Sequence, residues 1–215
     1  MFNYVPVFLD SGLPEVKQRL ERNPRIGREI RIDGWPSTTE RSGPSARYTP
    51  GSMFDLGEFL DYFERVRERT RRVAVCIPED RIEWRPRPGA FSLGDLVRHI
   101  AVTERYMWAE TVLNRPSRYV SHGPEIASGA AGILALLDRL HQEAMAMFRT
   151  LTPEALAGKC TTPEGTAITT WKWLRLMPEH EIHHRGQIYL LLNLLEVATP
   201  PLYGLTSEEV RARSR

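Results

Sequence analysis

The chain has 215 residues, a length that fits one domain of ordinary size with an appendage and a core of its own. Its 29 basic and 27 acidic residues nearly balance, which argues against a nucleic-acid-binding protein. The two cysteines, Cys76 and Cys160, lie far apart in a chain without a secretory leader, so we expect reduced thiols in a cytoplasmic protein. The apolar run 188–198 contains Asn193 and Glu196 and is too short to span a bilayer, so no membrane segment is expected.

Residues 1–52 differ from the rest of the chain in their Pro, Gly and Ser content and in their broken pattern. A short helix is predicted over 13–22, and a strand over 28–35, where apolar and polar residues alternate. The segment 36–52 has the composition of a linker. We therefore expect an irregular N-terminal extension ahead of the main domain.

Helical periodicity begins after this extension. The first predicted helix covers 53–77 and ends before Pro78, and its arginine-rich stretch 64–72 indicates a solvated face. The second covers 93–113 and follows a capping box formed by Ser92 and Asp95. The predicted core positions of these two helices are Phe59, Phe63, Val66, Thr70, Val73, Leu93, Leu96, Ile100 and Met107.

Two further helices are predicted over 126–150 and 169–196, with a loop over 151–168 between them. The third helix is expected to bury Ile133, Leu137, Leu140, Ala144 and Phe148. The expected fold is therefore all-α, with a four-helix bundle over 53–205 and a charged tail over 206–215. In such bundles, cofactor sites are built from side chains on facing helices.

The segment "MPEHEIHHRGQIYLLLNLLE" (177–196) contains three of the six histidines. At about 100° per residue, His180 and His184 fall in the middle of the expected buried stripe, and His183 and Glu181 fall at its two edges. Burying two imidazoles without partners costs a few kcal/mol each, so the pair either forms hydrogen bonds or shares a metal. The same stripe is expected to contain Trp173, Leu176, Met177, Leu191, Leu194 and Leu195.

A third imidazole strengthens the metal interpretation. His99 borders the apolar stripe of helix 93–113 and can face the bundle interior. Three neutral imidazoles leave an open position on a divalent ion, with Zn²⁺ or Ni²⁺ expected and Mn²⁺ or Fe²⁺ as alternatives. His141, beside Leu137 and Phe148, is a secondary candidate, and His122 in the loop "SHGPE" is expected to be exposed.

Other residues around the histidines have competing interpretations. Gln187 either orients a ligand histidine or forms a hydrogen bond in the core. Arg185 is expected to point to solvent, and Pro178 is expected within one continuous, kinked helix. The residues expected beside the ligands or in the pocket are Tyr106, Trp173, Met177 and Gln187.

The stretch "HEIHH" (180–184) also matches the H-E-x-x-H signature of zinc proteases, in which Glu181 is the general base. No glycine and third histidine follow at the spacing of one such class, because Gln187 and Leu190 occupy those positions. The angle of Glu181 on the helix also turns it away from the histidines. A zincin-type protease is therefore kept as the third interpretation of the site.

The motifs "LVRHIAVTERYMW", "EHEIHHRGQIYLLLNLLE" and "PPLYG" together resemble the DinB-like superfamily over residues 53–205. This resemblance implies a four-helix bundle, a homodimer, and a divalent metal held by His99, His180 and His184. Some relatives are thiol-dependent S-transferases or isomerases that use mycothiol, bacillithiol or glutathione. A low-molecular-weight thiol is therefore one possible co-substrate.

These observations lead to a functional expectation. An open three-histidine site predicts a metal-dependent enzyme, of transferase or hydrolase type, that acts on a small molecule. The metal would activate water or, as the resemblance alone implies, a thiol. The alternative is a metal-binding stress or sensor module without turnover. No nucleic acid or membrane partner is expected.

Overall fold

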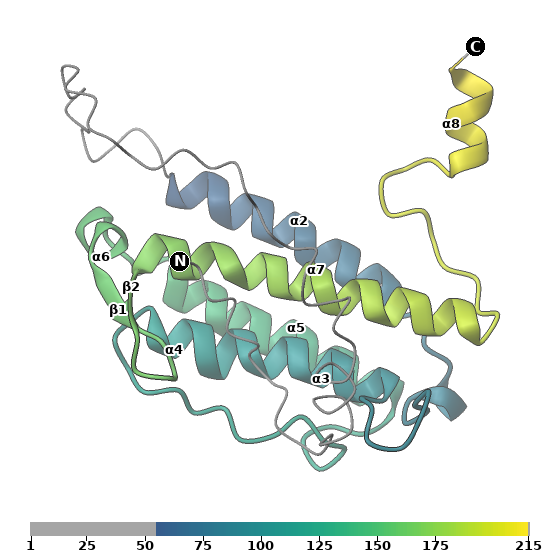
Figure 1. Ribbon diagram of the computed structural model, residues 1–215, viewed down its shortest axis with the longest axis horizontal. Coiled ribbons are helices and arrows are strands. Elements are labelled where there is room, and N and C mark those ends of the chain that lie inside the picture. Colours follow the sequence, from purple (N-terminus) through teal and green to yellow (C-terminus); the bar gives the residue numbers. More distant parts are fainter. Residues whose placement is uncertain (1–54, 215) are drawn as a thin grey trace, which may run out of the picture. The chain divides into compact units, whose positions relative to one another are not determined.

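Helices make up most of residues 55–214, which are the residues that the computed structural model describes (Figure 1). The sequence predictions for 13–22, 28–35 and 36–52, and the irregular extension that contains them, lie outside the described residues. The long helices are α2 (Leu56–Ala74), α3 (Leu93–Thr103), α5 (Gly129–Phe148) and α7 (Thr170–Leu194). The fold is therefore the all-α four-helix bundle expected from the sequence.

Local chemistry explains where these helices begin. The Asp55 carboxylate accepts a hydrogen bond from the Glu58 amide (2.8 Å) at the start of α2. At the start of α3, Ser92 and Asp95 form the predicted capping box. The second predicted helix does not continue as one regular α-helix, because α3 passes into a π-helical turn, η2 (Glu104–Trp108), and then into α4 (Ala109–Thr111).

Two pairs of consecutive long helices, α2/α3 and α5/α7, lie diagonally across the bundle, whereas α3 and α5 are neighbours. Both α2 and α3 contact α5 and α7, so the order around the bundle is α2, α7, α3, α5. Figure 1 shows the four helices running side by side. The two helices that carry the candidate histidines, α3 and α7, are therefore adjacent, and α2 lies diagonally opposite α3.

The segment 151–168 was predicted as a loop, and the structure corrects this. A short helix, α6 (Pro153–Ala157), is capped by the Thr152 side chain and is followed by a hairpin of β1 (Lys159–Thr161) and β2 (Ala167–Thr169). The strands pair antiparallel with Cys160 opposite Ile168, and both side chains pack toward the core. The turn contains Gly165 with a φ of 84°, a conformation that glycine adopts without steric cost.

Two further short helices lie in segments for which no helix was predicted. A 3₁₀ turn, η1 (Glu79–Arg81), follows α2, and α8 (Ser207–Arg213) lies within the charged tail. A capping box of Thr206 and Glu209 explains the start of α8. No helix between residues 55 and 214 combines the length and the apolar character that crossing a bilayer requires.

The core consists of two hydrophobic clusters, and all the core positions predicted for α2, α3, η2 and α5 are buried. Helices α2, α5 and α7 contribute to both clusters, whereas α3 contributes to one cluster and its continuation through η2 and α4 to the other. Along each of these four helical segments, a polar side chain interrupts the apolar stripe between the two clusters. The interrupting residues are Arg67 in α2, Glu104 in η2, His141 in α5, and Glu181 and Arg185 in α7. We call these five residues the polar layer. Its presence corrects the prediction that the whole arginine-rich face of α2 is solvated.

The rotation of α7 also differs from the prediction. Glu181 and Arg185 are 2% and 3% exposed, whereas Leu176 and Leu194, expected in the buried stripe, are 40% and 63% exposed. The buried face is centred roughly 100° away from His180. The histidines therefore lie on the flank of α7 that faces α3, and Pro178 lies within the continuous helix as predicted.

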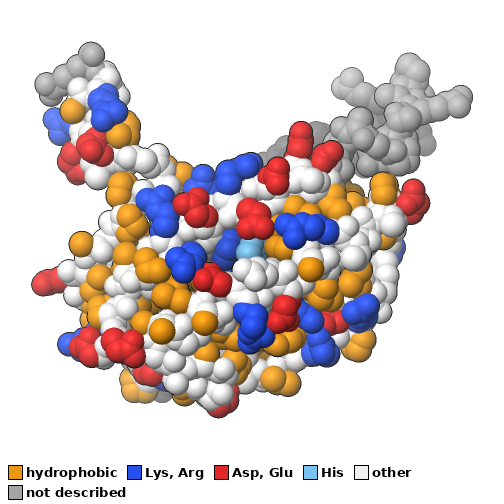
Figure 2. Space-filling model, turned by 180° about the vertical axis from the view of Figure 1, so that it is seen from behind, with side chains coloured by type: hydrophobic (Ala, Val, Ile, Leu, Met, Phe, Trp, Pro, Cys, Tyr) orange, Lys and Arg blue, Asp and Glu red, His pale blue; other side chains and the backbone are white. Residues whose placement is uncertain are grey.

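Charged side chains of both signs are interspersed over the outer surface. Figure 2 shows lysines and arginines alternating with aspartates and glutamates over one face, with a histidine side chain visible between them. Exposed ion pairs such as Arg71–Asp138, between α2 and α5, belong to this surface.

Candidate metal centre

Three histidines from two helices converge on one point. The Nε2 atom of His180 lies 3.1 Å from Nε2 of His99 and 3.0 Å from Nε2 of His184. One ring nitrogen from each residue falls within a group whose members are all within 4.8 Å of one another. Residues 81 positions apart in the chain therefore present nitrogen atoms to a common centre.

A hydrogen bond on the opposite side of the ring determines which nitrogen of His184 is free. The Nδ1–H of His184 donates to Gln187 Oε1 (2.7 Å), and His99 Nδ1 lies 3.2 Å from the Tyr119 hydroxyl. A neutral imidazole that donates through Nδ1 keeps a lone pair on Nε2. The lone pair of His184 Nε2 therefore points toward Nε2 of His180, as in metal-binding histidines oriented by outer partners.

The environment keeps all three imidazoles neutral. His99 is buried, and His180 and His184 are half-buried, so solvent reaches the cluster from the α7 side. Burial, followed by the charges of the neighbouring histidines, lowers the pKa of His180 to about 2 and holds the pKa of His99 far below its ordinary value. Burial lowers the pKa of His184 to about 4. At neutral pH the cluster thus offers lone pairs without competition from protons.

Aromatic rings surround the three histidines. The Trp108 ring lies 4.9 Å from that of His180, and the Phe91 ring lies 5.4 Å from that of His99. His122 was expected to be exposed, but it is half-buried, with its ring 5.4 Å from that of His99. Arg98 of α3 holds the loop there, because its Nε–H donates to the His122 carbonyl (2.8 Å), and within the loop the Tyr119 hydroxyl lies 2.6 Å from His122 Nδ1.

The predicted neighbours of the ligands have different positions. Gln187 contacts His184 directly, and its amide nitrogen also lies 3.1 Å from His183 Nε2. Met177 and Trp173 lie in the hydrophobic core, where Trp173 packs against Trp108 at a ring distance of 5.4 Å. Trp108, which the sequence analysis did not select, is the tryptophan that packs against His180.

Tyr106 was expected beside the ligands or in the pocket. Its ring packs at the edge of the core, with the guanidinium carbons of Arg105 and Arg118 5.3 and 5.5 Å from the ring centroid. The π-helical turn contains an extra residue, which rotates the positions after Thr103 relative to a regular α-helix. This rotation turns Trp108 toward His180.

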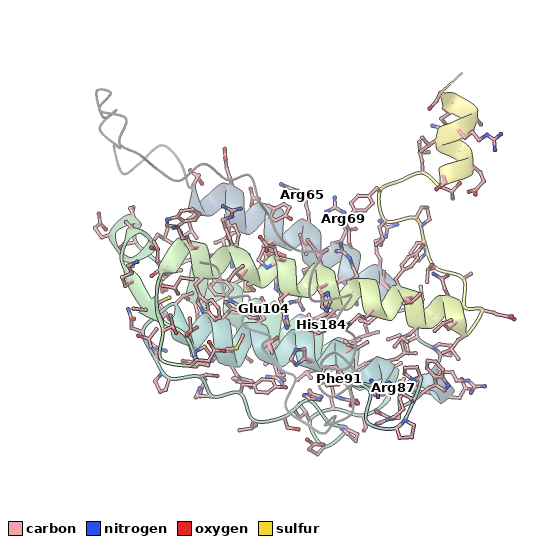
Figure 3. The ribbon with its side chains drawn as sticks, in the orientation of Figure 1. Arg65, Arg69, Arg87, Phe91, Glu104 and His184 are labelled. Carbon is pink, nitrogen blue, oxygen red and sulfur yellow. The ribbon has the colours of Figure 1, made fainter. Side chains whose placement is uncertain are left out.

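The remaining charged candidates belong to the polar layer. His141, the secondary metal candidate, lies 2.7 Å from Glu104 through Nδ1 and 3.1 Å from Glu64 through Nε2. Arg185, expected in solvent, donates to the Val66 carbonyl (3.2 Å). The Arg67 guanidinium contacts both Glu104 and Glu181. Figure 3 shows Glu104 and His184 between the helices, whereas Arg65 and Arg69 extend from the outer side of α2.

This arrangement argues against the zincin-type protease. The Glu181 carboxylate points into the core and receives a hydrogen bond from Arg67 (2.8 Å), so it does not face the histidines as a general base must. Burial raises the pKa of Glu181, although the positive charge of Arg67 opposes this. The nitrogen donors that meet come from His99, His180 and His184, the set that the DinB-like resemblance implies.

Comparison with curated proteins finds a relative in Bacillus subtilis (strain 168), the protein YjoA. The two sequences are 24% identical over 153 residues, which cover 70% of this chain and 97% of YjoA. The crystal structure of YjoA is also similar to this chain, with a TM-score of 0.54 at 21% identity over 69% of this chain and 99% of that one.

Two other solved structures share the fold. A DinB-like protein from Bacillus cereus ATCC 10987 has a TM-score of 0.59 at 17% identity, over 67% of this chain and 95% of that one. YfiT from Bacillus subtilis is described as a probable metal-dependent hydrolase with an unusual four-helix bundle topology. Its structure has a TM-score of 0.55 at 18% identity, over 75% of this chain and 95% of that one. Residues 62–188, more than half of the chain, match the DinB superfamily. The chain is a member of the DinB superfamily.

Proposed function

We propose that this protein binds a divalent metal ion through His99, His180 and His184 and catalyses a metal-dependent hydrolysis of a small molecule. The observation that carries the proposal is the convergence of three ring nitrogens on one centre. The fold that the chain shares with YfiT, a probable metal-dependent hydrolase, supports the reaction class.

The donor set fits a divalent ion such as Zn²⁺ or Ni²⁺. In tetrahedral zinc sites with Zn–N bonds of about 2.0–2.1 Å, the nitrogens lie about 3.3 Å apart. The two Nε2–Nε2 distances of 3.1 and 3.0 Å are close to this value, so a small expansion would accommodate the ion. A bound ion supplies Lewis-acid activation of a water or thiol at the position that three protein ligands leave open.

The surrounding residues hold the ligands and shape the space beside them. Gln187 accepts a hydrogen bond from the far side of His184, and in the proposed site the Tyr119 hydroxyl accepts one from the far side of His99, so that both Nε2 lone pairs are directed at the metal. Burial raises the pKa of Tyr119 to about 12, so its hydroxyl stays protonated and can donate to His122. Phe91 and Trp108 provide apolar walls, which suit a substrate with an apolar group beside the reacting bond.

Metal content tests the site. The wild type and the variants His99→Ala, His180→Ala and His184→Ala are purified without a histidine tag and analysed by plasma mass spectrometry. We expect about one metal ion per chain in the wild type and none in the three variants. The matched control is His183→Ala, because His183 is exposed and outside the group of three. Metal that persists in His99→Ala would contradict the proposed ligand set.

Turnover tests the reaction. The metal-loaded wild type is assayed against aryl esters and amides, with and without a low-molecular-weight thiol, beside His99→Ala. Hydrolysis that depends on metal and His99 is expected. Activity that requires the thiol would assign the protein to S-transfer instead, and metal binding without activity in any assay would favour a sensor or stress module.

A further inference from the structure

The polar layer joins all four helices at one level of the bundle. Arg67 comes from α2, Glu104 from η2, His141 from α5, and Glu181 from α7. Arg67 Nη2 donates to Glu181 Oε2 (2.8 Å) and to Glu104 Oε2, and His141 Nδ1 lies 2.7 Å from the other oxygen of Glu104. One guanidinium nitrogen of Arg67 thus links η2, which continues the α3 helix of His99, to α7, the helix of His180 and His184.

Charge determines what this connection does. Glu104 and Glu181 stand on the two histidine-bearing helices, and without a cation between them two buried carboxylates repel. Because a single nitrogen contacts both, their carboxylate oxygens lie within about 6 Å of each other. Arg67 therefore replaces a repulsion between the two helices by an attraction.

The attraction acts at the level of the histidine cluster. Glu181 follows His180 in the chain, and Glu104 lies five residues after His99. Arg185, one turn beyond Glu181, is held by the Val66 carbonyl of α2, so two consecutive turns of α7 are fixed against α2. These contacts set the rotation of α7, which directs its histidines toward α3.

Stability alone does not account for such a layer. Replacing a buried ion pair by apolar side chains of similar volume is often neutral or stabilising. Within residues 55–214, three buried atoms of the Arg67–Glu181 ion pair have no hydrogen-bond partner: Arg67 Nε, Arg67 Nη1 and Glu181 Oε1. Part of the hydrogen-bonding capacity of this ion pair is therefore unused among the described residues. We propose that Arg67 is a positioning residue for the histidine cluster, which sets the separation and rotation of α3 and α7 by bridging Glu104 and Glu181. The inference deepens the proposed metal site and rests on it.

The test removes the bridge without leaving an unpaired charge. The double variant Arg67→Met/Glu181→Met keeps the side-chain volumes and the Glu104–His141 pair, so it is expected to fold, as checked by circular dichroism. Zinc affinity, measured by competition with a chromophoric chelator, is expected to fall about tenfold. The visible spectrum of the Co²⁺ form reports coordination geometry and is expected to change. The single variant Arg67→Met leaves the two carboxylates repelling, so its zinc affinity is expected to fall further.

The matched control is Arg71→Met/Asp138→Met, which removes an exposed ion pair that α2 forms with α5. This control should keep the wild-type zinc affinity and cobalt spectrum. If the folded Arg67→Met/Glu181→Met variant does the same, while only its melting temperature changes, the layer is merely structural and the inference is overturned.

A measurement on metal-free protein separates this inference from the proposed function. The imidazole nitrogen NMR signals of His99, His180 and His184 are expected to shift in Arg67→Met/Glu181→Met and to stay unchanged in the control. Failure of the wild type to bind zinc or cobalt would refute the metal site. The NMR signals alone would then decide whether Arg67 positions the cluster, and unchanged signals would overturn it.

Discussion

The histidine cluster and the polar layer both place polar side chains of α7 between the helices, yet their electrostatics differ. In the layer, the Arg67 guanidinium stands between the carboxylates of Glu104 and Glu181, so the negative charges have a cation from the chain itself. In the cluster, neutral imidazoles bring their Nε2 atoms together, with His180 Nε2 3.1 Å from His99 Nε2 and 3.0 Å from His184 Nε2, and the charges that would attract a counter-ion are absent from these rings.

The polar layer therefore balances its charges within the chain, whereas the histidine cluster is completed by a bound metal ion in the proposed function. Removing a member of the layer leaves a buried charge without its partner, which is costly to folding. Removing a histidine from the cluster leaves no unpaired charge, so its main effect is on binding. The following predictions test this division, from the largest expected effect to the smallest.

Breaking the layer is expected to have the largest effect on folding. Glu104→Ala leaves Arg67 and His141 without their shared carboxylate, and the free energy of unfolding should fall by about 3–5 kcal/mol. His99→Asn, the matched change in the cluster, should cost less than about 2 kcal/mol in metal-free protein. Urea denaturation measures both variants. Equal losses would contradict the division between the two regions.

Adding metal is expected to stabilise the protein through the cluster. Zinc at a hundred times its dissociation constant contributes about 2.7 kcal/mol, which corresponds to a rise of roughly 5–10 °C in the melting temperature of a chain of this size. Scanning calorimetry before and after removal by a chelator measures the rise. His184→Asn should abolish it, because that variant lacks one of the converging nitrogens.

A smaller effect is expected from the hydrogen bond that orients His184. Gln187→Leu removes the acceptor of the His184 Nδ1–H, so the ring can turn or change tautomer. Zinc affinity should fall about tenfold, equivalent to about 1.4 kcal/mol. Isothermal titration calorimetry measures the change. Gln187→Glu keeps the acceptor and should retain the affinity, and equal losses in both variants would contradict an orienting role.

The smallest effect concerns the pH dependence of the layer. Although burial opposes it, the hydrogen bond to Glu104 raises the pKa of His141 above its ordinary value of 6.5. A raised folded-state pKa gives stabilisation that is complete below pH 6.5 and is lost as the pH rises through the folded-state pKa. The wild type should therefore exceed His141→Gln in unfolding free energy by more at pH 6 than at pH 8.5. A constant difference would show that His141 does not titrate in this range.

The sequence predicts the fold well where apolar residues recur on one side of a helix. Phe63 and Val73 in α2, and Leu137 and Phe148 in α5, are buried as their spacing of three and four residues predicts. The phase of α7 was wrong because leucines occupy most positions from 190 to 195 and so mark no single face. The buried face depends instead on Glu181 and Arg185, whose burial requires contacts with α2 more than a hundred residues earlier.

The site was partly accessible from the sequence. The spacing of His180 and His184 places both on one side of α7, and His99 was proposed as the third ligand from its position at the border of an apolar stripe. The structure brings nitrogen atoms of these three residues together. Trp108 and His122 were missed because a π-helical turn and a loop contact bring them to the cluster, and neither leaves a periodic signal. The interruptions of the apolar stripes at Arg67, Glu104 and His141 were the available signal for the polar layer.

The diagonal placement of α2 and α3 has a consequence for biosynthesis. Because α7 is the fourth long helix described and contacts both α2 and α3, neither of these helices has this neighbour until residues 170–194 are synthesised. Two of the three converging nitrogens also lie on α7. We therefore expect that a nascent chain arrested before residue 170 cannot capture metal, and that its α2 and α3 stay accessible to chaperones and proteases until the ribosome releases the C-terminal part.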